Sequence, residues 1–382
     1  MSPERAPRVV GLVADDLTGA ADAAVGFAEA GWRSDIVLDL AAARPHGDVD
    51  ARPVLLAVNA QTRHADAAAA RARTAGTVTA LRDAGAERLF VKIDSTMRGS
   101  VAAQIEGALE AWTRPGALAS AVICPAFPAH GRTVVDGDVR VHGEPVHLTA
   151  AGTDPVAPVG TAALGELIPG AAATAGARML ILDAETDTDL ARIAARVAAA
   201  DDDVVAVGSG GLAAALAAAW RSGSTPAAPP RRGGGVLVAV SSLHPVSSAQ
   251  IAHVRPRLSE NDLLLTPGEE MLADPEAAAD VLARRVVAAL ADRRFGALVL
   301  VGGDGAAAVL AALRAERIVL GAQPLRGCPA GTIIGGAADG LAVVTKSGGF
   351  GDDATLGTLL DLLGAAPAGL LDLSSNEGPT HD

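Results

Sequence analysis

The stretch Phe90-Val-Lys-Ile-Asp-Ser-Thr-Met-Arg-Gly-Ser100 indicates how the chain folds and where it can bind a ligand. Its first part is apolar apart from Lys92, which predicts a buried strand, and the apolar run stops at Asp94. A carboxylate, three hydroxyls, an arginine and a glycine then follow within seven residues. Ligands bind at the carboxyl ends of strands in open α/β sheets, so the polar run predicts a site. The alternative is a capped helix start, with Asp94 or Ser95 as N-cap and Arg98 solvated.

Composition limits the class of protein. The 382 residues are enough for two domains, and half of them are apolar, while five Phe, three Trp and no Tyr leave the core to Ala, Val, Leu and Ile. The net charge of −13 argues against a nucleic-acid-binding protein, which would show a basic stripe. An anionic substrate would therefore need a local cationic pocket. Candidates for that pocket are Arg63, Lys92, Arg98 and Arg132.

Cysteines and termini give few signals. Cys124 and Cys328 are far apart, lack metal-ligand spacing and each lie beside a proline, so we expect two buried thiols. Residues 1–8 are polar and show no signal peptide, and no uncharged apolar run approaches the ~20 residues of a membrane helix. We expect a cytoplasmic protein that does not bind membranes.

Strands and helices alternate through the first half, which predicts an α/β fold with a mostly parallel sheet. Strands are expected at 8–14, 34–40, 53–58, 89–93, 119–124, 179–182 and 204–207, and helices at about 20–30, 66–84, 101–111, 189–199 and 212–220. The stretch 133–169 is rich in Gly, Pro, Asp and His and is expected to form hairpins and loops near the site.

A second α/β unit follows a linker. Residues 222–235 are rich in Gly and Pro without a periodic apolar pattern, so we place the linker there, between an N-terminal domain at 1–221 and a C-terminal domain at 236–364, with a ligand cleft between the domains. Residues 365–382 are expected to be a disordered tail. Strands are expected at 236–240, 263–265, 297–301 and 341–345, and helices at 247–258, 274–291, 306–315 and 353–363.

Four strand ends of the first half carry polar clusters. These are Asp15/Asp16, 61–63, 92–98 and 127–132. The ends of parallel strands meet at one edge of a sheet, which would bring acids close to several cations. Arginine binds a carboxylate in bidentate fashion, and aspartate orients or deprotonates a hydroxyl, so the pattern suits a small polyhydroxy acid. Taken singly, each cluster could instead be a helix cap or a surface ion pair.

The second half carries two glycine-rich turns between a strand and a helix, at 302–305 and 346–351. Neither is a Walker A loop or a G-x-G-x-x-G fingerprint. Backbone N–H groups at a helix N-terminus favour phosphate, so we expect phosphate binding, with tight turns alone as the alternative. The two halves together suggest phosphoryl transfer across a cleft, with a Mg²⁺ ion bridging the phosphates.

The chain resembles the four-carbon acid sugar kinases over nearly its whole length. The matching segments are 14–20 (ADDLTGA), Thr62-Arg63, 92–99 (KIDSTMRG), 125–128 (PAFP), Gly131-Arg132, 208–213 (GSGGLA), 302–304 (GGD) and 346–351 (KSGGFG). The resemblance implies an N-terminal acid-sugar domain, a C-terminal nucleotide domain, and ATP-dependent phosphorylation of acids such as threonate, erythronate or oxo-tetronates. A homodimer is left open.

The chain departs from the family pattern in the nucleotide half. Where the family usually has Ser-Gly-Ser-Cys-Ser-Pro-Val-Thr, residues 240–247 read Val-Ser-Ser-Leu-His-Pro-Val-Ser. A glycine is replaced by Ser241, a hydroxyl by His244, and a threonine by Gly305. These changes motivate a rival hypothesis, a sugar-acid-binding or regulatory protein whose nucleotide site has decayed. A nicotinamide-dependent oxidoreductase is disfavoured by the missing fingerprint.

Site residues can now be assigned as expectations. Asp16 and Asp94 are the candidate catalytic bases, with Asp16 preferred, and the sequence identifies no metal ligand. Expected acid-sugar contacts are Asp15, Arg63, Lys92, Ser95, Thr96, Arg98, Phe127 and Arg132. Expected ATP contacts are Ser242, His244, Gly302, Gly303, Asp304, Gly305, Lys346, Gly348, Gly349 and Gly351.

Overall fold

The computed structural model describes residues 7–40, 52–154, 156–174, 176–220, 234–266 and 275–364. We call residues 7–220 the N-terminal half and residues 234–364 the C-terminal half. The predicted tail at 365–382 and nearly all of the predicted linker at 222–235 lie outside the described residues.

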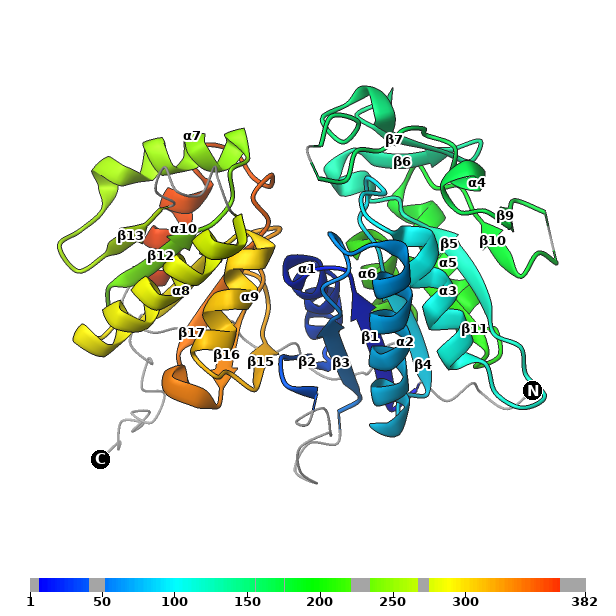
Figure 1. Cartoon of the computed structure of the whole chain (residues 1–382), viewed down its shortest axis with the longest axis horizontal. Helices are drawn as coiled ribbons and strands as arrows, with labels where there is room; N and C mark the ends of the chain where they lie inside the picture. The colour runs from blue at the N-terminus through cyan, green and yellow to red at the C-terminus, as the bar shows by residue number, and fades with distance from the viewer. Residues whose placement is uncertain are drawn as a thin grey trace, which may run out of the picture.

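The N-terminal half alternates strands and helices as expected (Figure 1). Its strands are β1 (Val9–Ala14), β2 (Arg33–Val37), β3 (Val54–Asn59), β4 (Arg88–Lys92), β5 (Ser120–Cys124), β9 (Ala171–Ala172), β10 (Met179–Ile181) and β11 (Val204–Gly208). Its helices are α1 (Leu17–Glu29), α2 (Ala67–Asp83), α3 (Val101–Trp112), α4 (Leu164–Leu167), α5 (Asp187–Ala198) and α6 (Gly210–Ala219). All pairings among these strands are parallel.

The C-terminal half repeats this architecture. Its strands are β12 (Val236–Val240), β13 (Leu263–Leu265), β14 (Ala297–Val301), β15 (Arg317–Leu320), β16 (Ala330–Ile334) and β17 (Ala342–Lys346). Its helices are α7 (Pro245–Val254), α8 (Pro275–Asp292), α9 (Gly303–Ala312) and α10 (Thr355–Gly364). Helix α9 begins three residues earlier than predicted, because the glycine-rich segment after β14 forms its first turn.

One 14-stranded sheet runs through both halves, in the order β13-β12-β14-β17-β16-β15-β2-β3-β1-β4-β11-β5-β10-β9. The halves join where β15 pairs antiparallel with β2. Strands β15 and β16 are antiparallel and were not predicted. They interrupt the strand–helix rhythm on which the prediction relied, and β16 includes Gly331, whose missing side chain weakens a strand pattern.

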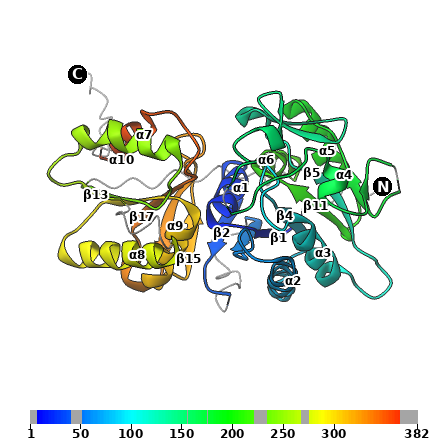
Figure 2. The same cartoon turned by 45° about the horizontal axis from the view of Figure 1, so that its top comes forward.

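Helices cover both faces of the sheet, which explains why most of the strand residues are buried and apolar (Figure 2). Helix α1 also contacts α9, so the first helices after β1 and β14 meet across the junction. Three antiparallel pairings separate β14 from β1, so these two strands run in opposite directions along the sheet. The N-terminus of α9 nevertheless reaches the N-terminus of α1, at the edge formed by the carboxyl ends of the N-terminal strands.

A small antiparallel sheet covers that edge, as expected for the stretch 133–169. It consists of β6 (Arg132–Val135), β7 (Asp138–Val141) and β8 (Glu144–Pro145). Both cysteines are buried free thiols, which confirms that prediction. Among the described residues, no helix has the length and apolar character needed to cross a membrane.

Candidate active site

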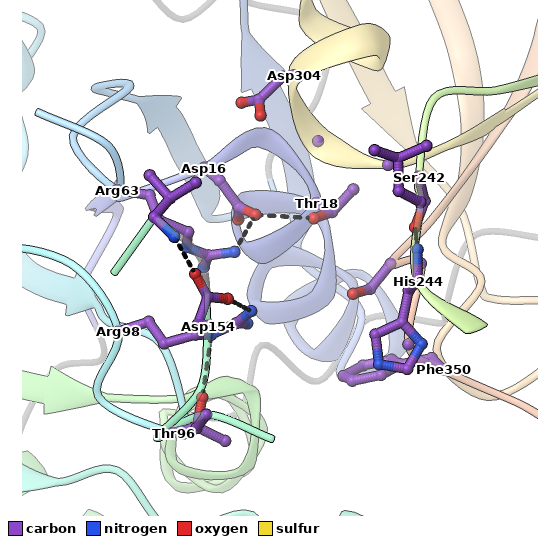
Figure 3. Close-up of a pocket in the computed structure, with 18 of the residues that line it drawn as sticks. Asp16, Thr18, Arg63, Thr96, Arg98, Asp154, Ser242, His244, Asp304 and Phe350 are labelled. Atoms are coloured by element: carbon purple, nitrogen blue, oxygen red, sulfur yellow. Dashed lines mark hydrogen bonds and ion pairs between the residues drawn. The ribbon is translucent and has the colours of Figure 1, made fainter. Parts of the chain in front are cut away.

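A cavity of about 490 Å³ lies between the two halves. It is bounded on one side by loops of the N-terminal half and on the other by the loops that follow β12, β14 and β17 (Figure 3). A smaller pocket of about 70 Å³ adjoins it and shares Asp16, Arg63 and Arg98 with it. All four predicted strand-end clusters contribute lining residues to these cavities.

Asp16 stands at the N-terminus of α1. Its Oδ1 accepts a hydrogen bond from the Gly19 amide at 2.6 Å, which caps the helix. Its Oδ2 accepts from Thr18 Oγ1 at 3.0 Å and from Arg63 Nη1 at 2.5 Å. Figure 3 shows this group facing Asp304 of the C-terminal half across the cavity. The cap fixes the orientation of a carboxylate that lines both cavities.

Arg63 is surrounded by carboxylates. Its Nε donates to Asp15 Oδ2 at 2.7 Å, and its Nη2 lies 3.5 Å from Asp94 Oδ1. Burial would lower the pKa of Arg63, but Asp15, Asp16 and Asp94 outweigh it and raise the pKa. Arg63 therefore holds three acids together, which leaves little of its charge for a substrate.

Asp94 orders the loop after β4. Its carboxylate accepts from Arg98 Nε at 2.9 Å and Nη2 at 3.1 Å, and from the Thr96 hydroxyl. Burial would raise the pKa of Asp94, but Arg98 and Arg63 outweigh it and hold the pKa well below its usual range. The capped-helix alternative is wrong: α3 begins at Val101, with Ser100 as its N-cap residue.

The loops after β3 and β4 pack tightly on each other. Gly99 has a φ of +86°, and a Cβ there would lie 2.7 Å from the Arg63 carbonyl oxygen. Ser100 Oγ also donates to the Ala65 carbonyl at 2.8 Å. Only glycine fits at position 99, and the packing sets the position of Arg63 relative to Asp94.

Two further cations line the cavities. Arg98 donates to Asp154 Oδ2 at 3.3 Å, and 32% of its side chain is exposed. Arg132 lines both cavities, and its buried Nε has no hydrogen-bond partner within the described structure. Lys92 lines the smaller pocket, but it is 4% exposed and its Nζ donates to the Ile93 carbonyl at 2.8 Å. Arg132 thus has an unused donor at the cavity, whereas the three guanidinium nitrogens of Arg98 already donate to Asp94 and Asp154 and its side chain is partly exposed.

An aromatic stack joins the halves. The ring centroids of Phe127 and His130 are 4.3 Å apart, and those of His130 and Phe350 are 4.5 Å apart with nearly parallel planes. Burial lowers the pKa of His130 to about 4, helped by Arg132, so the ring is neutral at physiological pH. Phe350 belongs to the loop after β17, and the stack therefore holds this loop of the C-terminal half against the N-terminal half.

Three loops form the wall on the C-terminal side. Gly302, with a φ of +103°, follows β14 and is the N-cap residue of α9, and the first turn of α9 lines the cavity through residues 303–305. The loop after β17 is fixed by Ser247 Oγ, which donates to the Gly348 carbonyl at 2.8 Å. The backbone amides at a helix N-terminus, with the helix dipole behind them, favour a phosphate group.

Most of the predicted site residues line one of the cavities, with three exceptions. Asp15 lines neither cavity and is 1% exposed, so its part is to hold Arg63. Lys346 is 1% exposed and its Nζ donates to the Ser347 carbonyl; burial lowers its pKa to about 8. Gly351 lies outside both cavities and is exposed. Ser95 and Phe127 line only the smaller pocket.

Sequence reasoning missed several lining residues. They include Thr18, Asp22, His64, Thr149, Asp154 and Ser209. Asp22 stands out, because no hydrogen bond or ion pair within the described structure engages its carboxylate. Burial raises the pKa of Asp22 to about 6, although the positive charge of Lys92 acts to lower it. The signal was available: Asp22 lies one turn after Thr18 on the same face of α1.

Within the described residues, no group of three or more His, Cys, Asp or Glu side chains could hold a metal ion.

An acid-binding wall opposite a helix N-terminus suited to phosphate defines the class of the protein as an α/β phosphotransferase. Comparison with known proteins agrees. Residues 10–174 and 169–216 match the sugar-binding N-terminal domain family, and residues 270–356 match the nucleotide-binding C-terminal domain family.

Relatives match over nearly the full length. A D-threonate kinase of Bordetella bronchiseptica is 38% identical, covering 91% of this chain and 95% of the relative. A D-threonate kinase of Salmonella typhimurium is 27% identical, covering 90% and 96%. The chain belongs to the four-carbon acid sugar kinase family, as the sequence motifs predicted, and is an enzyme that phosphorylates a hydroxyl group.

Solved structures share the fold. A Bordetella bronchiseptica domain of unknown function, with bound citrate and as a domain-swapped dimer, is 36% identical over 93% of this chain and 98% of that chain, with a TM-score of 0.50. A Haemophilus influenzae protein is 20% identical over 92% and 100%, with a TM-score of 0.67, a likeness of fold alone.

Proposed function

We propose that the protein transfers the γ-phosphoryl group of ATP to a hydroxyl of a four-carbon acid sugar, with D-threonate as the first substrate to test. The observation that carries the proposal is the meeting of Asp16 with the N-terminus of α9. A Cβ on Gly303 would lie only 3.1 Å from Asp16 Oδ2, so a phosphate at this helix end and a hydroxyl at this carboxylate would be neighbours.

Arg98 and Arg132 would bind the carboxylate of the acid. Arg98 is partly exposed, and Arg132 has a buried Nε that lacks a hydrogen-bond partner within the described structure. Arg63 is less suited to this contact, because three aspartates already surround it. This assignment leaves Arg63, Lys92 and Asp94 as residues that shape the pocket.

Asp22 would bind a hydroxyl of the acid. Its carboxylate lies against Gly210, where any Cβ would overlap Oδ2, and it lines the smaller pocket. A carboxylate accepts hydrogen bonds from hydroxyls, so this residue can distinguish a polyhydroxy acid from a plain one. Asp22 and the two arginines would hold opposite ends of a short substrate.

Asp16 would act as the general base. The attacking hydroxyl oxygen forms the new bond to the γ-phosphorus, the bond to the β-phosphate oxygen breaks, the hydroxyl proton passes to Asp16 and ADP leaves. Asp94 is the weaker candidate, because Arg98 and Arg63 hold its pKa well below its usual range and it lines only the smaller pocket, whereas Asp16 lines both cavities.

The loops after β12, β14 and β17 would hold ATP. The first-turn amides of α9 would receive the phosphates, and His244 and Phe350 line the same cavity. A Mg²⁺ ion fits this site if the phosphates supply most of its ligands, because Asp304 presents an exposed carboxylate at the cavity. The ion would neutralise charge on the phosphates.

Domain organisation and assembly are part of the proposal. We assign acid-sugar binding to residues 1–221 and nucleotide binding to 236–364, which the two family matches support. We also propose a homodimer, because the Bordetella bronchiseptica structure is a dimer. Light scattering coupled to size-exclusion chromatography tests the dimer.

A panel of acids tests the activity. D- and L-threonate, D- and L-erythronate, and 2- and 3-oxo-tetronate are each mixed with ATP and Mg²⁺, and ADP release is measured. We expect release with at least one acid, and heat on titration of ATP into the protein. The absence of both would contradict the kinase and favour a sugar-acid-binding protein with a decayed nucleotide site.

A further inference from the structure

The side chain of Ser241 is fixed at the turn from which α9 starts. Ser241 directly follows β12, and both its amide and its Oγ donate to the Val301 carbonyl, at 2.8 and 3.1 Å. Val301 is the last residue of β14, immediately before Gly302. The serine hydroxyl therefore lies beside the first turn of α9 and lines the larger cavity.

Two glycines make room for this side chain. A Cβ on Gly302 would overlap Ser241 Oγ, and a Cβ on Gly305 would overlap both the Cβ and the Oγ of Ser241. Gly305 has no positive φ, so its backbone alone would accept any residue. The lack of a side chain at 305 is thus explained by the serine opposite it, and a side chain can stand at 241 or at 305 but not at both.

We propose that Ser241 supplies a phosphate-binding hydroxyl to the nucleotide site, and that Gly305 is required because Ser241 fills the space in front of it. This inference rests on the proposed function. A hydroxyl rotates freely, and the Val301 carbonyl would keep its hydrogen bond from the Ser241 amide if the hydroxyl turned to a phosphate oxygen. Donation to phosphate therefore leaves no buried carbonyl unpaired.

The test is a reciprocal exchange of the side chain between the two positions. The variants are Ser241→Ala, Gly305→Ser and the double variant S241G/G305S, and ATP affinity is measured by calorimetry beside the KM for the acid. Ser241→Ala, which removes one oxygen, should weaken ATP binding about tenfold and leave the KM for the acid unchanged. Gly305→Ser should weaken ATP binding more than about 100-fold. The double variant should bind ATP at least tenfold more tightly than Gly305→Ser does.

Control variants distinguish steric overlap at position 305 from a general loss of folding. Gly76→Ser places the same side chain on a helix where nothing lies within 4 Å, and Ser248→Ala removes an exposed hydroxyl from α7; both should behave like the native enzyme. Thermal unfolding of each variant, compared with that of the native protein, reports whether the C-terminal half, which carries both positions, is folded.

The possible failures are distinct. Native enzyme that binds no ATP would contradict the proposed function itself. If the native enzyme binds ATP, native-like affinity in Ser241→Ala would overturn the hydroxyl assignment. A double variant no better than Gly305→Ser would overturn the spatial exchange.

Discussion

The Oδ2 atom of Asp16 lies 3.1 Å from the point at which a Cβ on Gly303 would stand. Asp16 caps α1 in the N-terminal half, and Gly303 opens α9 in the C-terminal half. The two helix N-termini therefore meet where the two halves of the protein face each other. Phosphoryl transfer requires such proximity, because the acceptor oxygen must lie in line with the phosphorus.

Gly303→Ala should slow the reaction without unfolding the protein. The added methyl group would push against the Asp16 carboxylate and separate the base from the phosphate site by a few tenths of an ångström. We expect kcat to fall at least about tenfold, since small misplacements at a reacting centre are costly. Thermal unfolding should be unchanged, and an unaltered kcat would contradict the arrangement.

Asp16→Asn and Asp94→Asn should fail in different ways. Asparagine is a good N-cap, so Asp16→Asn should keep α1 and the KM for the acid while kcat falls about 10²–10⁴-fold. Asp94→Asn removes the bidentate partner of Arg98 and one of the three carboxylates around Arg63, so the KM for the acid should rise and stability should fall by about 2 kcal/mol. Steady-state kinetics and urea unfolding separate the two. If neither variant lost turnover, the base would have to lie elsewhere.

Asp22→Asn should change how stability depends on pH. The folded-state pKa of Asp22 is about 6, above its ordinary value, so the folded protein binds this proton more tightly than the unfolded chain does. The carboxyl therefore costs stability progressively as pH rises from about 4 to 6. Its charged neighbours are Lys92, Asp16, Arg132 and Arg326.

The variant should match the native protein at pH 4 and exceed its stability by about 2 kcal/mol at pH 7. The KM for the acid should rise roughly tenfold, because a charge-assisted hydrogen bond is replaced by a neutral one. Urea unfolding at both pH values tests the first point, with the exposed Asp83→Asn as control. Parallel pH profiles for native and variant would refute it.

Arg317→Met should weaken the junction between the halves. Arg317 Nη1 lies 3.0 Å from Asp35 Oδ2, and the two side chains are 2% and 0% exposed, where β15 pairs with β2. Asp35 would keep its ion pair with Arg33, so removal of Arg317 should cost about 2 kcal/mol in the free energy of unfolding. Arg257→Met, which breaks an exposed pair with Asp361, should cost at most about 1 kcal/mol. Equal costs would show that the junction does not depend on the buried pair.

Local signals predicted much of the fold. Most of the parallel strands are short apolar runs followed by polar or glycine-rich residues, so β4 and the loop from Asp94 to Ser100 could be recognised from sequence. Strands β15 and β16 could not, because their position depends on pairing with β2, which lies about 280 residues earlier in the chain.

The stretch from Phe90 to Ser100 established by itself that a buried strand ends in a polar cluster, because apolar and polar runs act locally. Only tertiary packing decided which partners the residues of that cluster have. It pairs the carboxylate of Asp94 with Arg98 and surrounds Arg63 with three carboxylates. The same holds for Ser241 and Gly305. In sequence they are two unrelated departures from a family pattern, and only the folded chain brings them into one space, where a side chain at one position requires its absence at the other.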